Sequence, residues 1–290
     1  MNCKQYVPED YEAVCDFLIE LNREDRDHVN WNWARWEWMI GHPEFDTGLI
    51  SSIGLWKERD RIVGAAIYDM YFGEAFCGVL PGYEALYPEV LAYAYGNLKD
   101  DSGLAAAVCD DNAFEREAIV KAGFSPIEQD ETVMVLDLDR PFAASLPEGF
   151  RIEDTDPAKD PYGLQWLFWQ GFDHGDDREA FEREGLADLT QLFPRPHLNP
   201  ELSLTAVAPG GEKAAFCGLW YRDGTDYAYV EPVCTVPAYR GRGLAKALLF
   251  EAFRRAAALG AKSAYVISDQ VFYEKLGFRR EKHFTFYRKA

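Results

Sequence analysis

The sequence has little positive charge for its length. Its 290 residues include 30 Lys and Arg against 49 Asp and Glu, a formal net charge of -19 at pH 7. Proteins that bind nucleic acids draw affinity from basic side chains, so this balance excludes a phosphate backbone as the main partner. A cationic small molecule is the better expectation because an acidic surface attracts amines, although solubility explains such a charge equally well.

Cysteine pairs and long apolar runs are also missing. The six cysteines are scattered and none forms a Cys-x-x-Cys pair, so neither a zinc site nor a redox motif is predicted. No apolar run approaches the length of a membrane span, and the polar first ten residues do not resemble a signal peptide. We therefore expect a cytoplasmic protein with reduced thiols, no metal and no membrane partner.

The chain is long enough for two domains, and 48% of its residues are hydrophobic. Its predicted strands and helices follow the same order twice. Three landmarks repeat with one offset of 154 residues: Gly64 with Gly218, Gly123 with Gly277, and Phe124 with Phe278. We predict an internal duplication, with domains over residues 1–140 and 150–290 and a linker over residues 141–149.

A strand and a helix in the second half enclose a short loop. The β-branched and aromatic run from Tyr227 to Val236 predicts a strand that ends at Pro237. From Leu244, apolar residues recur at helical spacing until Gly260. The loop between these two elements is Arg240-Gly241-Arg242-Gly243.

This loop is predicted to bind an anion. Its two glycines permit a tight turn and close approach of a ligand, and the helix start directs unpaired N–H groups and partial positive charge at it. Arg240, Arg242 and Lys246 add full positive charges, which suit a diphosphate.

Spacing distinguishes three kinds of nucleotide-binding loop. A P-loop requires Gly-Lys-Ser/Thr after the second glycine, where Leu244 and Ala245 follow, and a dinucleotide fingerprint requires a third glycine where Lys246 stands. The remaining pattern, Arg/Gln-x-x-Gly-x-Gly/Ala after a strand ending near proline, resembles the coenzyme A pyrophosphate loop of the GCN5-related N-acetyltransferase (GNAT) superfamily. Arg240, Gly243 and Ala245 match its fixed positions.

A second segment supports this resemblance. Phe272-Tyr273-Glu274-Lys275-Leu276-Gly277-Phe278 follows a predicted strand and is similar to the superfamily's short tyrosine-bearing helix closed by Gly-Phe. With the internal repeat, the chain resembles a tandem GNAT protein over almost its whole length. Moving the loop back by 154 residues gives Leu86-Tyr87-Pro88-Glu89, so the N-terminal copy is predicted to be degenerate and not to bind coenzyme A this way.

The resemblance implies a fold class and a cosubstrate. The fold is α/β (α+β), with two GNAT-like domains that are each a mixed, mostly antiparallel twisted sheet flanked by helices. The cosubstrate is acetyl-CoA, with its diphosphate held by the loop and its pantetheine arm paired with the preceding strand. The implied cofactor-binding residues are Cys234, Thr235, Val236, Arg240, Gly241, Arg242, Gly243, Leu244, Ala245 and Lys246.

Acetyl transfer to an amine needs a base for the amine and an acid for the departing thiolate. We choose Glu231 as the base, acting directly or through water, because a carboxylate on an apolar strand is either exposed or functional. The next residue, Pro232, indicates a bulge. The resemblance implies Tyr273 as the acid, with a core tyrosine as the alternative. Cys234 is disfavoured as an acyl carrier because no histidine lies nearby in sequence.

Two other segments bear on the site. Superfamily members often have asparagine seven residues before the tyrosine, where this chain has Val266, with Ser268 or Asp269 as substitutes. Residues 181–192 are expected to form a helix over the acceptor pocket. A segment with four tryptophans, Trp31 to Trp38, is predicted to line an interface or pocket, with core packing as the alternative.

The sequence therefore predicts an N-acetyltransferase that moves the acetyl group of acetyl-CoA to a primary amine of a small molecule or peptide, by direct attack in a ternary complex. A non-catalytic acyl-CoA-binding or sensing module and a structural pseudoenzyme are the alternatives. No nucleic-acid partner is expected, and a homodimer is left open.

Overall fold

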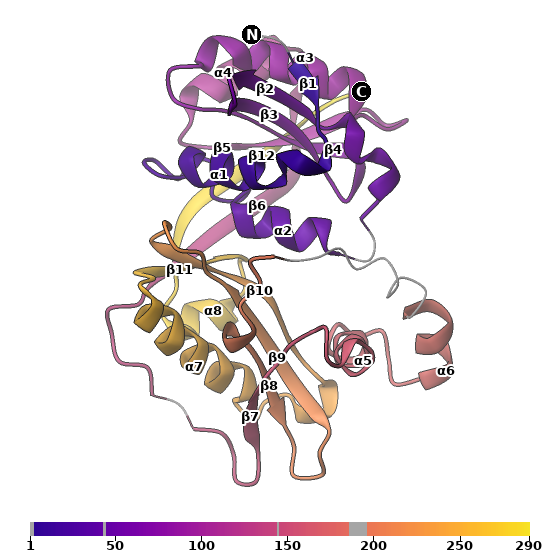
Figure 1. Cartoon of the computed structure of the whole chain (residues 1–290), viewed down its shortest axis with the longest axis vertical. Helices are drawn as coiled ribbons and strands as arrows, with labels where there is room; N and C mark the ends of the chain where they lie inside the picture. The colour runs from indigo at the N-terminus through magenta and orange to yellow at the C-terminus, as the bar shows by residue number, and fades with distance from the viewer. Residues whose placement is uncertain (1–2, 43–44, 144, 186–195) are drawn as a thin grey trace. The chain divides into compact units, whose positions relative to one another are not determined.

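The computed structural model describes residues 3–42, 45–143, 145–185 and 196–290, and the chain divides into two compact units (Figure 1). Unit 1 comprises Met1–Met134, Ile267–Val271 and Arg280–Ala290, and unit 2 comprises Val135–Val266 and Phe272–Arg279. Within the described ranges, no helix is both long and apolar enough to cross a lipid bilayer.

Unit 1 is a sheet with helices on both faces (Figure 1). Its helices are α1 (Tyr11–Leu21), α2 (Trp33–Ile40), α3 (Tyr87–Asn97) and α4 (Ala113–Lys121). Its strands are β1 (Cys3–Gln5), β2 (Gly54–Glu58), β3 (Arg61–Asp69), β4 (Tyr71–Val79), β5 (Leu104–Cys109), β6 (Ser125–Asp137) and β12 (Arg279–Lys289). They lie in the order β1-β2-β3-β4-β5-β12-β6, and β4 with β5 is a parallel pair, whereas β12 runs antiparallel to β5.

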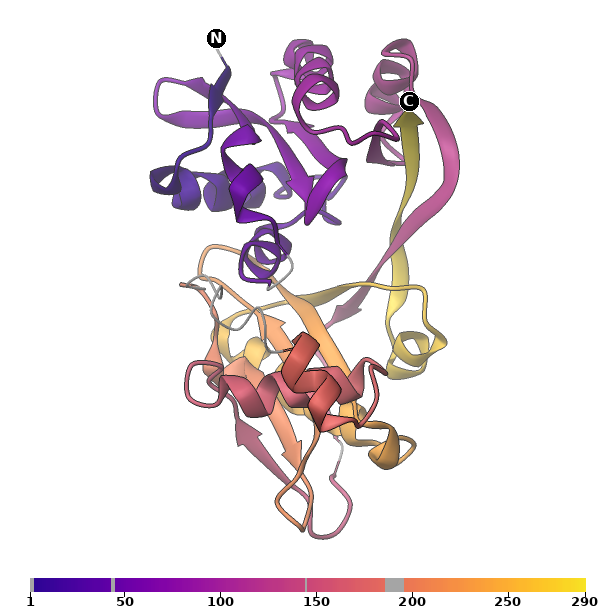
Figure 2. The same cartoon turned by 90° about the vertical axis from the view of Figure 1, so that its right-hand side faces the viewer.

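Unit 2 repeats this plan. Its helices are α5 (Pro161–Gly171), α6 (Arg178–Ala180), α7 (Leu244–Leu259) and α8 (Val271–Leu276). Its strands β7 (Arg151–Asp154), β8 (Ser203–Val207), β9 (Lys213–Trp220), β10 (Tyr227–Thr235) and β11 (Ser263–Ile267) lie side by side in chain order. Neighbouring strands are antiparallel except β10 and β11, which are parallel. Helices α5 and α7 cover opposite faces of this sheet (Figure 1, Figure 2).

The two units share one order of elements, in which a first strand and helices precede three antiparallel strands, a helix, a parallel strand and a short helix. Gly64 lies on β3 and Gly218 on β9, while Gly123 and Gly277 follow α4 and α8 with φ of 88° and 104°. The predicted fold class is confirmed, and the offset of 154 residues corresponds to this repeat.

Each unit is made of separate segments of the chain, whereas the predicted domains are contiguous. The C-terminal strand β12 is grouped with unit 1, where it lies between β5 and β6, while the last residues of β6 are grouped with unit 2. A strand pattern records which residues extend and which face is apolar, but it does not record the neighbouring strand. For this reason contiguous ranges were the expectation from sequence alone.

The tryptophan-rich segment packs inside unit 1. Trp33 and Trp36 are fully buried, and Trp36 makes an edge contact with Tyr6. Trp31 stacks on Phe76 with ring centroids 5.6 Å apart. Core packing accounts for Trp33 and Trp36, whereas Trp31, although buried, also lines a small pocket.

Candidate functional site

Strand β10 has one paired edge and one edge that opens. It pairs with β9 along its length, with a bulge between Val230 and Val233 that confirms the bulge predicted at Pro232. Its parallel pairing with β11 extends only from Tyr227 to Tyr229. Beyond that point the main chain of β10 faces the gap between two diverging strands, where an extended ligand can add hydrogen bonds.

The hydrogen bonds between β9 and β10 determine which main-chain groups of β10 face this gap. The N–H of Val236 donates to Ala214 O at 3.0 Å. Because antiparallel pairs alternate along a strand, Cys234 also directs its N–H toward β9, whereas Thr235 directs its N–H toward the open edge. Of the three residues expected to pair with a pantetheine arm, the geometry makes Thr235 the available donor.

The loop before α7 forms an open cradle of N–H groups. Gly241 and Gly243 have φ of 75° and 78°, a conformation that favours glycine, and a Cβ at either position would meet nothing within 4 Å. Side chains cap other helices, such as Asp160 at α5, but Gly243 supplies none to α7. The first bond into α7 runs from Ala247 N to Gly243 O at 3.0 Å.

This geometry leaves the start of α7 rich in unused donors. In the part of the chain that the structure describes, no acceptor is in place for the N–H groups from Gly241 to Lys246. The buried Leu244 and Ala247 anchor the helix on the sheet, so the cradle is held in position. Unpaired N–H groups and the helix dipole together favour a bound anion here.

Two of the three predicted basic side chains remain available beside the cradle. Arg242 and Lys246 are exposed and lie over the rings of Tyr239 and Phe250, at 5.5 and 5.2 Å from the ring centroids. Neither has a carboxylate at ion-pair distance among the described residues. Their charges can therefore act on an anion at the start of α7.

Arg240 has a different role in the structure. Its Nε donates to Thr235 O and its Nη2 to Gly171 O, each at 3.0 Å, and Nη2 lies 2.8 Å from Asp173 Oδ1. Its main-chain N–H donates to Pro237 O. The guanidinium thus ties the end of β10 to the C-terminal end of α5. Sequence offered no signal for this contact because Asp173 lies far from the loop along the chain.

The predicted acid and base come together in unit 2. Tyr273 lies on α8, is 8% exposed, and has edge contacts with Phe272 and Phe278. Burial raises the pKa of Tyr273, and the negative charge of Glu231 and the nearby Cys217 raise it further. The phenol therefore stays protonated at neutral pH and can act as a proton donor. Glu231 itself is partly exposed on β10.

Cys234 is a packing residue in this arrangement. It is buried under α5, and a Cβ on Gly171 would lie 2.6 Å from its Sγ. Burial raises the pKa of the Cys234 thiol to about 12. The thiol is therefore protonated at neutral pH, which disfavours an acyl-enzyme route as the sequence predicted.

The helix expected over residues 181–192 is only partly described. Helix α6 ends at Ala180, a π-helical turn covers Phe181–Gly185, and residues 186–192 lie outside the described residues. Phe181 is fully buried against Trp166 and Tyr162. These aromatic contacts attach the turn to α5.

Unit 1 lacks the corresponding cradle. Helix α3 begins directly after a 3-10 turn, with Pro88 in its first turn, and Glu89 accepts a hydrogen bond from Trp56 Nε1 at 2.8 Å. The offset of 154 residues places Ile119 opposite Tyr273 and Cys77 opposite Glu231. The structure therefore provides neither a glycine turn nor the acid and base pair at these positions of the N-terminal copy.

Comparisons with known proteins agree with this geometry. Residues 202–280 match the family model of the acetyltransferase (GNAT) domain. A comparison with curated protein sequences finds no match.

Solved structures extend the likeness to the whole chain. The tandem GNAT protein from the clavulanic acid biosynthesis pathway has a TM-score of 0.64 at 15% identity, covering 99% of this chain and 98% of its own. A GNAT-family acetyltransferase from Colwellia psychrerythraea has a TM-score of 0.59 at 12% identity, with 100% of both chains covered. A GCN5-related N-acetyltransferase from Sphaerobacter thermophilus has a TM-score of 0.56 at 18% identity, covering 99% and 95%.

Proposed function

We propose that this chain, whose residues 202–280 match the acetyltransferase (GNAT) domain, transfers the acetyl group of acetyl-CoA to a primary amine of a small molecule. The fold supports acyl transfer in general. One observation supports the coenzyme A thioester as donor: the uncapped N–H cradle from Gly241 to Lys246, which has the form of a diphosphate site.

The cradle and its two cations would hold the diphosphate. Main-chain N–H groups at the start of α7 donate to its oxygens, and Arg242 and Lys246 add charge. Thr235, on the open edge of β10, would donate its N–H to the thioester arm. When bound, acetyl-CoA supplies the activated acyl group.

Glu231 and Tyr273 would carry the protons. Glu231 accepts the ammonium proton of the acceptor, directly or through water, so that the neutral amine can attack. Tyr273, buried on α8, then donates its phenolic proton to the departing thiolate, and the proton that the newly acetylated nitrogen loses returns to the phenolate. The protein's charge of -19 supports a cationic acceptor.

The first test is binding of coenzyme A to the full chain by calorimetry. In Gly243→Glu, binding should weaken by at least about 100-fold, because a carboxylate enters the cradle and the left-handed φ is strained. Gly224→Glu is the matched control, since Gly224 also has a positive φ of 93° and open space at its Cβ. Equal affinity in the two variants would contradict the proposal.

Turnover is measured separately, as thiol release with a panel of primary amines. Acetylation of at least one amine by wild type and its loss in Gly243→Glu are expected. Coenzyme A binding without turnover on any amine would favour the sensing module over the enzyme.

A further inference from the structure

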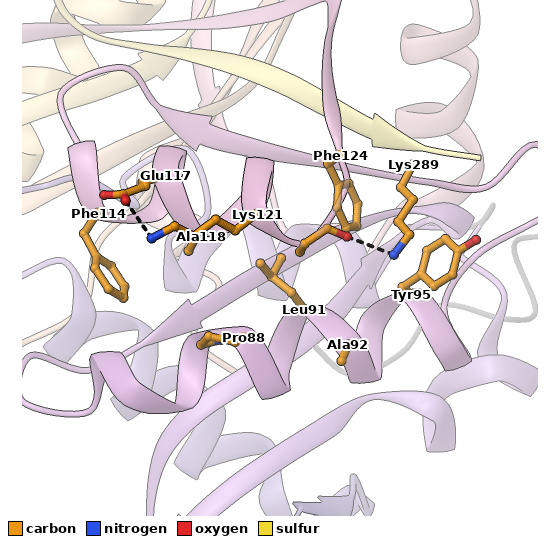
Figure 3. Close-up of a pocket in the computed structure, with 11 residues that line it drawn as sticks. Pro88, Leu91, Ala92, Tyr95, Phe114, Glu117, Ala118, Lys121, Phe124 and Lys289 are labelled. Atoms are coloured by element: carbon orange, nitrogen blue, oxygen red, sulfur yellow. Dashed lines mark hydrogen bonds and ion pairs between the residues drawn. The ribbon is translucent and has the colours of Figure 1, made fainter.

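A second concave site lies wholly within unit 1. An open groove of about 490 Å³ runs between α3 and α4 (Figure 3). Pro88, Leu91 and Ala92 of α3 form one wall, and Phe114 and Ala118 of α4 form the other. None of these residues belongs to the acetyl-transfer site proposed above, so the groove needs a separate explanation.

The groove has an apolar floor and exposed apolar walls. Phe114 is 45% exposed although it is a large aromatic side chain, and its ring points from α4 toward α3 (Figure 3). Lys121 and Glu117, one turn apart on the α4 side of the groove, form an ion pair at 2.6 Å and neutralise each other. A small, mostly apolar cleft with few polar groups is typical of a small-molecule site.

One end of the groove carries positive charge. Tyr95, Phe124 and Lys289 close this end (Figure 3), and the Lys289 ammonium lies 4.4 Å from the centroid of the Tyr95 ring. The Lys99 ammonium lies 4.7 Å from the same ring. Two ammonium groups therefore gather around one aromatic ring at the end of an apolar groove.

The polar contacts around these two cations are few in the part of the chain that the structure describes, and the Tyr95 hydroxyl between them donates to Ala290 O at 2.6 Å. Lys289 donates to Ala122 O at 2.9 Å, which uses one of the three donors of its ammonium. Among the described residues, neither Lys99 nor Lys289 has a carboxylate at ion-pair distance. Lys289 lines the groove and Lys99 lies over the same Tyr95 ring, so an anionic ligand with an apolar tail is favoured.

We propose that this groove binds a medium-chain fatty acid, with the tail between α3 and α4 and the carboxylate at Lys289. From Pro88 to Tyr95 the helix rises about 10 Å, which suits a tail of medium length. A carboxylate can accept from the two unused donors of Lys289 while the tail covers Leu91 and Phe114. The ligand class follows from charge and shape together.

The test measures binding of decanoate, decanol and decylamine to the full chain by calorimetry, below micelle concentration. Decanoate should bind about tenfold more tightly than decanol, because a charged hydrogen bond is added, and decylamine more weakly than both. Each methylene from octanoate to decanoate should lower the dissociation constant about fourfold if it is fully buried. Equal affinity for decanoate and decanol would overturn the proposal.

Variants locate the site. Lys289→Gln should lower decanoate affinity to that of decanol, and Lys289→Arg should restore the preference. Ala92→Trp should abolish binding by filling the groove, whereas Ala258→Trp, on an exposed position of α7, should not. If Lys289→Gln does not fold, the Ala92 and Ala258 pair still decides the location, and unchanged binding in Ala92→Trp would refute it.

Two further experiments distinguish the fatty-acid site from the coenzyme A site, and a free fatty acid from a membrane lipid. Gly243→Glu should bind decanoate like wild type, even if coenzyme A binding fails; competition between coenzyme A and decanoate would refute a separate site. Co-sedimentation with phosphatidylglycerol vesicles in the absence of decanoate binding would identify a membrane surface instead, and would overturn the fatty-acid proposal.

Discussion

Individual side chains in this protein depart from what their position in a motif suggests. Arg240 occupies a motif position, yet its guanidinium holds Gly171 O and Asp173 instead of facing the start of α7. Tyr273 is buried on α8, near enough to Glu231 for the carboxylate charge to raise the pKa of its phenol. The motif predicts the glycine turn before α7, but the direction of a long side chain depends on partners distant in sequence.

Tyr273 offers a direct test of chemistry at the residue scale. Tyr273→Phe should lower kcat about 100-fold, because a general acid is lost, and leave coenzyme A affinity unchanged. Tyr287→Phe is the matched control, since both tyrosines are 8% exposed. Steady-state kinetics and calorimetry provide the two readouts. Turnover of Tyr273→Phe at the wild-type rate would rule out its role as the acid.

A buried ion pair in unit 1 should make stability depend on pH. His28 Nε2 lies 2.8 Å from Glu115 Oε1, and both side chains are buried. Burial acts to lower the pKa of His28, but the Glu115 carboxylate outweighs it, so the net shift is upward. The folded protein therefore binds this proton more tightly than the unfolded chain does. The contribution of this proton to the free energy of unfolding is complete below the His pKa of the unfolded chain, about 6.5. It is lost as pH rises through the pKa of the folded protein.

His28→Gln should therefore destabilise the protein most at low pH. We expect a loss of about 3 kcal/mol near pH 6 and a smaller loss near pH 9, because one partner of a buried charged pair is removed. Urea unfolding at a series of pH values measures it. Glu115→Gln should flatten the same part of the profile. A loss for His28→Gln that grows with pH would show that the sign is wrong.

Among the elements, those with strong local signals were predictable from the sequence. Pro237 ends the ladder and the spacing from Leu244 to Gly260 defines α7, as the structure has them. The N–H groups of β10 that stay available for a ligand were not predictable, because they depend on the register between β10 and β9. In this register the N–H of Val236 donates to Ala214 O, and the N–H of Thr235 points to the open edge. Period alone does not specify register with a particular neighbour.

Strand β12 packs in unit 1, although the elements just before it in the chain belong to unit 2. Phe286 on β12 is 2% exposed and lies opposite Ala107 of β5, in unit 1. Phe286→Ala should cost about 3 kcal/mol and lower hydrogen-exchange protection in β3 to β5. Phe216→Ala on β9, from an equally buried position, should instead affect β8 to β10. Protection lost equally in both regions by Phe286→Ala would contradict this assignment.

The whole molecule is two copies of one plan that differ at the start of the main helix, α3 in unit 1 and α7 in unit 2. The repeat was predictable because glycines with positive φ, such as Gly123 and Gly277, mark equivalent turns. The exchange of β12 was not, since it changes which unit a strand completes without changing the strand's own pattern. The groove between α3 and α4 also left no motif, because it is formed by two helix surfaces rather than by a run of residues.

The place of β12 bears on what a shortened chain could fold into. Because β12 lies between β5 and β6, a chain cut before Arg279 would leave these two strands without the neighbour that joins them. An isolated N-terminal repeat should therefore expose unpaired N–H and C=O groups along β5.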